Sequence, residues 1–300
     1  MQKPLHLKQG DKVAIISTAR KISEKEIEPA IEMLNKWGLI VVLGENLFKE
    51  DHQFSGTTKE RTSDLQKALD DEMVKAVFCA RGGYGTVQII DELDFTKFVN
   101  SPKWIVGYSD VTVLHNQINQ NFGIQTLHAT MPINFPTNTK ESLESLRKAL
   151  FGEELNYDFD AHELNRNGSV EGILVGGNLS IIYSLTGTNS QIDTKDKILF
   201  LEDLDEYLYH VDRMMQNLKR AGLLENLAGL IVGGMSDMND NDIPYGKSAI
   251  EIILDAVKEY SYPVCFDFPA GHIDNNRALV MGKNVKLVVD ESCSLSFTNS

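Results

Sequence analysis

The sequence predicts an α/β fold, with an N-terminal parallel, doubly wound sheet domain and a smaller C-terminal mixed α/β domain. Three observations support this prediction. Short apolar runs rich in β-branched residues alternate with helical segments through the first half of the chain, with short connections between them. The same alternation resumes after a polar stretch at 151–168. Residues 278–297 then alternate in the way typical of a β-hairpin or small sheet.

The elements of the first half follow from their own patterns. KVAIIST at 12–18 reads as a buried parallel strand, because it is short, apolar and β-branched. Ser23 is a suitable N-cap for a helix that Gly38 ends. By the same criteria we expect strands at 12–18, 39–43, 76–80, 104–107 and 124–128. Helices are expected at 23–37, 59–72, 87–93, 110–121 and 139–150.

The second half begins after a polar, irregular stretch that ends in the turn signal NRNG at 165–168. We therefore expect an N-terminal domain at 1–150, a linker at 151–168 and a C-terminal domain at 169–300. Further strands are predicted at 170–174, 197–201, 230–232 and 264–268. Further helices are predicted at 179–185, 206–220 and 248–260.

Composition limits the possible partners. The chain has 300 residues and a formal net charge of −14, so nucleic acid and anionic membranes are poor partners. Its N-terminus lacks the apolar run of a signal peptide, and no segment is apolar for long enough to cross a bilayer. Cys79, Cys265 and Cys293 are odd in number and far apart, which fits a cytoplasmic protein with reduced thiols. No Cys-x-x-Cys or His-Glu-x-x-His motif indicates a metal site.

The segment WIVGYSD at 104–110 contains the first candidate for chemistry. Three apolar residues run into Gly107, and Ser109 follows at the expected carboxyl end of the strand. Open α/β sheets bind ligands at that end, and a tight turn there can hold a serine nucleophile. Gly107 fits such a turn because a side chain would crowd the following helix. The alternative is that Ser109 and Asp110 only cap that helix.

Two candidates in the second half also follow apolar strands, Glu202 and His272. A serine hydroxyl needs a neighbouring base, and histidine titrates in the useful range. A carboxylate can fix the imidazole tautomer, and the order Ser109, Glu202, His272 also occurs in α/β-hydrolases. The alternatives are a carboxylate at a helix N-terminus for Glu202 and a loop residue without a role for His272. His115 and His128 are the alternative candidates for the general base.

A glycine-rich turn, RGGYG at 81–85, lies between a predicted strand and a predicted helix. Adjacent glycines allow positive φ and a close approach to a ligand, so the turn can direct N–H groups at a phosphate, a carboxylate or a developing oxyanion. The alternative is a simple tight turn. Its pattern is neither G-x-G-x-x-G nor a Walker loop, which disfavours a dinucleotide or P-loop site. Val111 replaces the second glycine of G-x-S-x-G, which disfavours an ordinary α/β-hydrolase.

Several short blocks occur along the chain in a fixed order. They are RGGYG at 81–85, GYSD at 107–110 with Thr112 and LH at 114–115, EG at 171–172 with GGNLS at 176–180, LED at 201–203, and GH at 271–272 with Asn276. Each block is weak alone, but the ordered set is specific and spans residues 12–285. In combination and in this order, the blocks resemble the LD-carboxypeptidase family of serine peptidases, which includes murein tetrapeptide carboxypeptidases and microcin immunity proteins.

The resemblance implies a role for each matching residue. Ser109 looks like the nucleophile, His272 like the general base and Glu202 like its orienting partner. The backbone N–H groups of Gly83 and Asp110 look like the oxyanion hole. The residues implied to receive the substrate are Arg81, Gly82 and Tyr84, with Arg81 placed to meet its terminal carboxylate.

The resemblance also implies an activity. We expect a serine carboxypeptidase that hydrolyses the L,D-peptide bond to the C-terminal D-alanine of murein tetrapeptides in cell-wall recycling. Family members are typically cytoplasmic homodimers without a metal or organic cofactor. Two departures are HATMP at 128–132, where the family often has HGPM, and Val280, where it often has proline. The first leaves substrate preference open.

Two other functions remain open at this stage. One is hydrolysis of peptidyl or aminoacyl adenylate-type antibiotics, as in microcin immunity proteins. An aromatic residue that stacks on adenine would favour it, and Tyr84, Trp104 and Tyr183 are the candidates. The other is a non-catalytic α/β protein that binds an anion or another ligand at the Arg81 turn.

Overall fold

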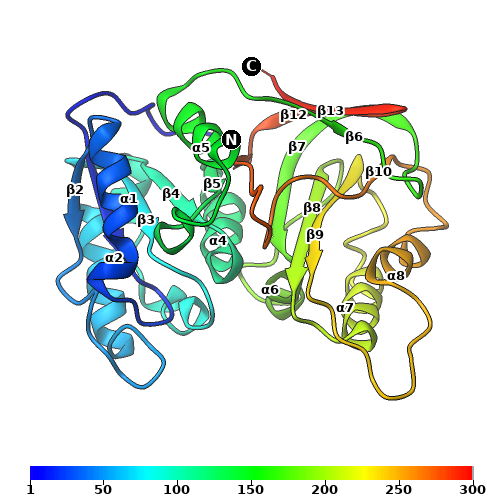
Figure 1. Ribbon diagram of the computed structural model, residues 1–300, viewed down its shortest axis with the longest axis horizontal. Coiled ribbons are helices and arrows are strands. Elements are labelled where there is room, and N and C mark those ends of the chain that lie inside the picture. Colours follow the sequence, from blue (N-terminus) through cyan, green and yellow to red (C-terminus); the bar gives the residue numbers. More distant parts are fainter. Residues whose placement is uncertain (299–300) are drawn as a thin grey trace.

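The computed structural model describes residues 1–298, which form two β-sheets with helices packed against them (Figure 1). The first half of the chain, blue to green in Figure 1, builds most of one sheet, and the second half builds the other. None of the helices in this part of the chain combines the length and apolar character needed to cross a bilayer. The predicted α/β class with two sheets is confirmed.

The first sheet has six strands, five of them from the first half of the chain. They are β1 (Lys12–Ile16), β2 (Ile40–Leu43), β3 (Val74–Cys79), β4 (Trp104–Gly107), β5 (Thr126–His128) and β11 (Leu279–Met281). Their order is β11-β5-β4-β3-β1-β2, and β1 to β5 pair in parallel. The accompanying helices are α1 (Glu24–Lys36), α2 (Thr58–Asp70), α3 (Thr96–Asn100), α4 (Thr112–Phe122) and α5 (Lys140–Phe151).

The second sheet has seven strands and is mixed, as predicted. They are β6 (Asn156–Asp160), β7 (Gly168–Asn178), β8 (Ile198–Leu204), β9 (Gly229–Ser236), β10 (Val264–Cys265), β12 (Asn284–Val289) and β13 (Ser292–Phe297). In the order β10-β9-β8-β7-β12-β13-β6, the first four strands are parallel and the remaining pairs are antiparallel. Its helices are α6 (Leu179–Leu185), α7 (Leu208–Arg220) and α8 (Ala249–Ala256).

Several details differ from the sequence-based expectations. The stretch 151–168, expected to be an irregular linker, contains β6, whose residues pair with β13. Glu202 lies inside β8, opposite Asn178 of β7, and not beyond the strand's end. In the expected hairpin at 278–297, β12 and β13 pair with each other, but β11 pairs with β5 instead. These strands depend on partners outside their own segment, so the local pattern did not reveal them.

The helix expected at 87–93 is not an α-helix. The chain forms two short 3-10 helices there, Thr86–Gln88 and Ile90–Glu92.

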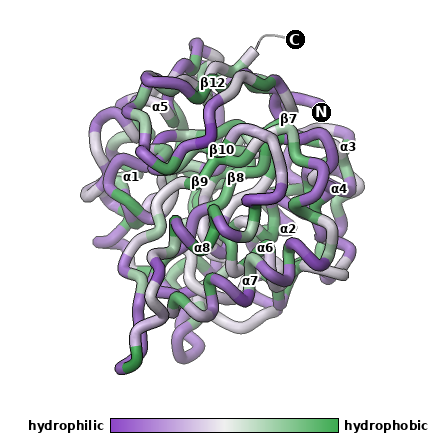
Figure 2. Tube along the Cα trace, turned by 90° about the vertical axis from the view of Figure 1, so that its right-hand side faces the viewer, coloured by the Kyte–Doolittle hydropathy of each residue, from purple (hydrophilic) through white to green (hydrophobic). Residues whose placement is uncertain are grey.

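A hydrophobic core runs across both sheets. One cluster of buried side chains includes Phe78 and Val106 of the first sheet together with Phe200, Ile231 and Phe268 of the second half. Figure 2 shows the hydrophobic colour concentrated along β8 and β9 in the interior. Because the same cluster stabilises both sheets, we expect the two halves to unfold together.

Phe200 tests this shared core. Its ring is fully buried and packs against His128 of the first sheet, with a centroid separation of 5.0 Å. Replacing it by alanine removes contacts on both sides and should lower the free energy of unfolding by about 3–5 kcal/mol. Urea denaturation followed by circular dichroism should show one transition in both the wild type and Phe200→Ala. Two separate transitions would contradict a shared core, and Tyr209→Ala, at an exposed aromatic position, is the matched control.

Candidate active site

A cavity of about 520 Å³ opens where the carboxyl ends of β1, β3 and β4 face the second sheet. The loops that follow β1, β3 and β4 all contribute to it, at the edge where open α/β sheets bind ligands. From the first half it is lined by Arg20, Arg81, Gly82, Gly83, Ser109 and Asp110. From the second half it is lined by Asn178, Ser180, Asp203, Asp205, Glu206 and His272.

Ser109 occupies a strained backbone position. Its φ is +63°, in the left-handed region that residues other than glycine rarely adopt. A β-carbon at Gly107 would lie 2.8 Å from Val111 Cγ2, so the turn has no room for a side chain there. The N-cap of α4 is Val111 and not Ser109, so the interpretation of Ser109 as a simple helix cap is wrong. Strained serines of this kind are typical of nucleophile turns between strand and helix.

The glycine-rich turn lies directly against this serine. A β-carbon at Gly82 would be 3.0 Å from Ser109 Cβ and 3.1 Å from its Oγ. Gly83 has a φ of +114°, and within residues 1–298 its N–H has no hydrogen-bond acceptor. The backbone of the turn can therefore approach an atom bonded to Ser109 Oγ, which a bulkier sequence would prevent.

A buried network holds the two turns together. The Asp110 carboxylate accepts hydrogen bonds from Thr86 N (2.8 Å) and Thr86 Oγ1 (2.6 Å). Arg61, which is buried, donates through Nη1 to the carbonyls of Thr18 (2.7 Å) and Gly85 (3.0 Å). Burial raises the pKa of Asp110, and hydrogen bonds from Thr86 oppose that shift. These contacts fix the Gly-rich turn relative to Ser109.

Glu202 and His272 form a buried pair. The Nδ1 of His272 is 2.6 Å from Glu202 Oε2, and that oxygen also accepts the His272 backbone N–H at 3.2 Å. Glu202 is fully buried, and a β-carbon at Gly271 would lie 2.7 Å from its Oε2. Burial by itself would lower the pKa of His272, but the Glu202 carboxylate outweighs it and raises that pKa above 6.5.

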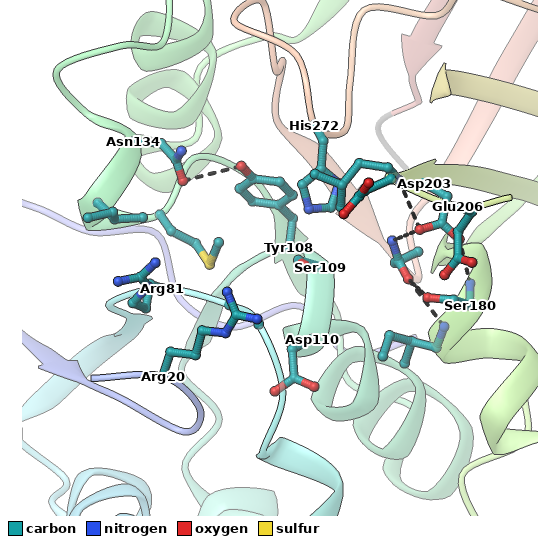
Figure 3. Close-up of a pocket in the computed structure, with 18 residues that line it drawn as sticks. Arg20, Arg81, Tyr108, Ser109, Asp110, Asn134, Ser180, Asp203, Glu206 and His272 are labelled. Atoms are coloured by element: carbon teal, nitrogen blue, oxygen red, sulfur yellow. Dashed lines mark hydrogen bonds between the residues drawn. The ribbon is translucent and has the colours of Figure 1, made fainter. Parts of the chain in front are cut away.

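His272 and Ser109 line the same cavity, as Figure 3 shows. Within residues 1–298, no hydrogen bond joins the side chains of His272 and Ser109. Hydrogen bonds between catalytic groups are often long in a free enzyme and shorten when the substrate binds. The Tyr108 ring packs edge-on against the imidazole of His272 at 4.8 Å, and its hydroxyl donates to Asn134 Oδ1 at 3.2 Å. Tyr108 thus holds the imidazole beside the turn that carries Ser109.

The competing histidines belong to the core. His115 and His128 are fully buried, and neither lines the cavity. The Nε2 of His115 donates to the Gly107 carbonyl at 2.8 Å, and burial lowers its pKa to about 4. Burial also lowers the pKa of His128 well below 6.5. Among the described residues, no group of three or more His, Cys, Asp or Glu is placed to hold a metal ion.

The cavity is electrostatically two-sided, with arginines on one wall and acids on the other (Figure 3). Arg81 was predicted to bind the substrate, whereas Arg20 was not predicted. The Arg20 side chain passes over Gly83, since a β-carbon there would be 2.6 Å from Arg20 Cδ. Within residues 1–298 the Arg20 guanidinium forms no ion pair, whereas Arg81 lies 4.0 Å from Glu26. Arg20 follows β1 at the ligand-binding edge of the sheet, and this position is the only sequence feature that could have indicated its role.

The acidic wall comes from residues that directly follow Glu202. Asp203 accepts hydrogen bonds from Asn178 Nδ2 (2.9 Å) and Ser180 N (2.8 Å). Burial and the neighbouring Glu202 raise the pKa of Asp203 to about 7. Asp205 and Glu206 complete this wall. The LED and GGNLS blocks contain most of these residues, but their spacing did not show that they converge.

One predicted substrate-binding residue lies elsewhere. Tyr84 is 47% exposed, is absent from the cavity lining and packs toward the Phe54 ring at 6.3 Å. The predicted residues Ser109, His272, Gly83, Asp110, Arg81 and Gly82 do line the cavity, and Glu202 contacts it through His272.

Comparisons with known proteins agree with this arrangement. The LD-carboxypeptidase N-terminal domain matches residues 13–129, and the LD-carboxypeptidase C-terminal domain matches residues 171–287. A probable murein peptide carboxypeptidase from Bacillus subtilis is 34% identical, over 98% of this chain and 93% of the relative. The crystal structure of a muramoyltetrapeptide carboxypeptidase from Oxalobacter formigenes matches with a TM-score of 0.87 and 26% identity, over 96% of this chain and 99% of that one.

The microcin C7 self-immunity protein MccF, in complex with aspartyl sulfamoyl adenosine, matches with a TM-score of 0.88. Its identity is 21%, over 99% of this chain and 98% of that one, so the likeness is one of fold. The two family matches and the 34% identical relative extend over both halves of the chain. The chain therefore belongs to the LD-carboxypeptidase family of serine peptidases.

Proposed function

We propose that this protein is a serine carboxypeptidase that releases C-terminal D-alanine from murein tetrapeptides by hydrolysing the L,D-peptide bond. One observation carries the proposal: Ser109, at a strained φ of +63° and in contact with Gly82, shares a cavity with the Glu202–His272 pair. A serine beside a base and free backbone N–H groups has what acyl transfer requires. Relatives named as murein peptide carboxypeptidases support the choice of substrate.

The reaction then runs through an acyl-enzyme. His272 Nε2 takes the proton from Ser109 Oγ as that oxygen attacks the carbonyl carbon of the scissile bond. The N–H groups of Gly83 and Asp110 stabilise the oxyanion. His272 passes the proton to the amine of the departing D-alanine, and water then releases the peptide by the same route in reverse. Glu202 accepts the Nδ1–H of His272 and keeps the imidazole oriented throughout.

In this proposal the arginines on one wall of the cavity and the acidic residues on the other orient the peptide. Arg20 and Arg81 receive the terminal carboxylate of the leaving D-alanine, because guanidinium groups match carboxylates in shape and charge. The wall formed by Asp203, Asp205 and Glu206 faces the remaining part of the peptide. A positively charged group there fits this wall better than a second carboxylate.

Hydrolysis of an adenylate-type antibiotic fits less well. None of the aromatic residues expected to be able to stack on adenine, Tyr84, Trp104 and Tyr183, lines the cavity. Trp104 is buried at the start of β4, and Tyr183 packs against His210 at 5.9 Å. The likeness to MccF concerns the fold, so it adds no argument for this substrate.

The proposal extends to organisation, assembly and location. Residues 1–150 supply the nucleophile and residues 169–300 supply Glu202 and His272, with 151–168 between them. The protein acts as a homodimer in the cytoplasm, where recycled cell-wall peptides arrive. The family resemblance supports both points.

Ser109→Ala tests the nucleophile. The substitution removes the attacking oxygen, so release of D-alanine from a murein tetrapeptide should fall by at least about 1,000-fold. Coupled-enzyme detection of D-alanine provides the measurement, and Ser184→Ala, at an exposed serine, is the control. Equal release by wild type and Ser109→Ala would show that another residue attacks, or that the protein is a binding protein with a contaminating activity.

Glu202→Gln tests the paired carboxylate through pH. The base must be neutral, so kcat/KM of the wild type should rise with pH through a pKa above 6.5. Without the carboxylate, burial dominates and lowers the pKa of His272. The rising limb should therefore move to lower pH, while the maximum falls by about 10³- to 10⁴-fold. If the rising limb of the kcat/KM profile lies at the same pH in Glu202→Gln and in the wild type, the group that titrates there is not His272. Glu206→Gln neutralises an acid of the same cavity that does not contact His272 and should leave the limb in place.

Arg20→Gln tests recognition of the terminal carboxylate. Loss of a charge-assisted hydrogen bond should lower kcat/KM for the tetrapeptide by about 10- to 100-fold, mainly through KM. A matched peptide ending in D-alanine amide lacks that carboxylate and should be affected much less. Equal losses on both peptides would mean that Arg20 supports the Gly83 turn and does not bind the carboxylate. Lys21→Gln, at an exposed neighbouring cation, is the control.

A further inference from the structure

A second cavity lies at the opposite end of the first sheet from the candidate active site. Its volume is about 260 Å³, and it contacts the beginnings of β4 and β5 through Trp104 and Gln125. Ser109, by contrast, follows the carboxyl end of β4. Lys3 and His6 of the N-terminal segment and Phe297 at the end of β13 all line this cavity. The two cavities share no lining residue.

Positively charged side chains converge on this second cavity. Lys3, His6 and Lys283 all line it. They lie close enough to influence one another, because burial and both lysines lower the pKa of His6, and burial and Lys3 lower that of Lys283. Neither lysine forms an ion pair with a carboxylate within residues 1–298. Such a group of cations is unexpected in a chain with a net charge of −14.

The two acidic residues of the cavity are bound by groups other than its lysines. Glu153 is held by Arg147, whose Nη1 and Nη2 lie 2.6 Å and 2.8 Å from its two carboxylate oxygens. Glu154 accepts a hydrogen bond from Asn156 Nδ2 at 2.7 Å and is the remaining acid in the lining. Arg147 also binds Glu144, with contacts of 2.9 Å and 2.7 Å, so it adds no free positive charge to the cavity. Neither Glu153 nor Glu154 forms an ion pair with Lys3 or Lys283 within residues 1–298.

The rest of the lining is suited to a small organic molecule. The rings of Trp104 and Phe297 form apolar walls, and Trp104 is fixed because its Nε1 donates to the Leu5 carbonyl at 3.0 Å. Gln125 is only 7% exposed, and its Oε1 has no hydrogen-bond partner within the described chain. That oxygen is an acceptor, so only a donor, such as a hydroxyl group, an N–H group or a water molecule, satisfies it, and the anionic group of a ligand must lie on the lysines instead.

We propose that this cavity is a second ligand site, which binds a small organic anion by its charged group on Lys3 and Lys283 and by its apolar body on Trp104 and Phe297. The chemistry is that of a phosphate monoester or a carboxylate. The volume limits the ligand to about the size of an amino acid or a small aromatic acid. Residues on both sides of the 151–168 stretch line the site, so an occupant bridges the two halves of the molecule. The site is independent of the proposed peptidase reaction.

Fluorescence of Trp104 provides the test. The chain has two tryptophans, so Trp37→Phe leaves Trp104 as the single reporter. Phenyl phosphate should quench it saturably, and benzoate should do so if carboxylates are also accepted. Inorganic phosphate should compete with phenyl phosphate but bind more weakly, and benzyl alcohol, which is uncharged, should not bind. Lys283→Gln should weaken phenyl phosphate binding by about tenfold, the usual effect of losing one charge-assisted hydrogen bond.

Matched variants make the result decisive. Lys286→Gln removes an equal charge from an exposed position of β12 and should leave the affinity unchanged. Ser109→Ala should also leave it unchanged, because Ser109 lines the other cavity. Lys3→Gln, in the exposed N-terminal segment, repeats the Lys283 test at a position where misfolding is not expected. Quenching that does not saturate, equal binding of benzyl alcohol, or unchanged affinity in both lysine variants would overturn the proposal.

Discussion

The close contact between α4 and β7 determines how the two halves of the molecule meet. The Asn178 backbone N–H donates to Thr112 Oγ1 at 3.0 Å, and a β-carbon at Gly177 would lie 2.6 Å from the same oxygen. Thr112 begins the helix that follows Ser109, and Asn178 is paired with Glu202 across β7 and β8. One interface hydrogen bond therefore relates the strained serine turn to the carboxylate of the opposite sheet, and glycine is required at 177 to permit it.

The site concentrates groups that are costly to bury. Glu202, Asp203 and Asp110 are each almost completely inaccessible, and Glu202 Oε1 and Asn276 Nδ2 have no partner within residues 1–298. Burial raises the pKa of Asp110 and of Asp203, which means that the folded state disfavours their charged forms. The shared core beneath, with Phe200 at its centre, offsets this cost. The strained backbone of Ser109 is a further cost of the same kind. The stability of the hydrophobic core maintains both the strain and the buried charged groups, which are unfavourable for folding but suited to reaction.

Sequence reasoning was most successful where the cause is local. The turn that needs Gly107, the glycines beside it in RGGYG and the helix that Ser23 begins could all be recognised from neighbouring residues. It failed where pairing partners are distant. The NYDFD strand within the polar linker depends on β13, and β11 depends on β5. Arg20 and the acidic wall could not be found because only the folded chain brings them to one cavity.

β11 has a consequence for how such a chain can be altered. After building most of the second sheet, the chain returns for three residues, Leu279–Met281, to become an edge strand of the first. The two halves are thus interlaced and not merely joined end to end. Suppose that two relatives recombine within 151–168, so that each half of the chimera comes from a different parent. The β11 strand of one parent would then have to pair with the β5 strand of the other. Productive chimeras would have to carry β11 together with the first half, which favours divergence of the whole chain as one unit.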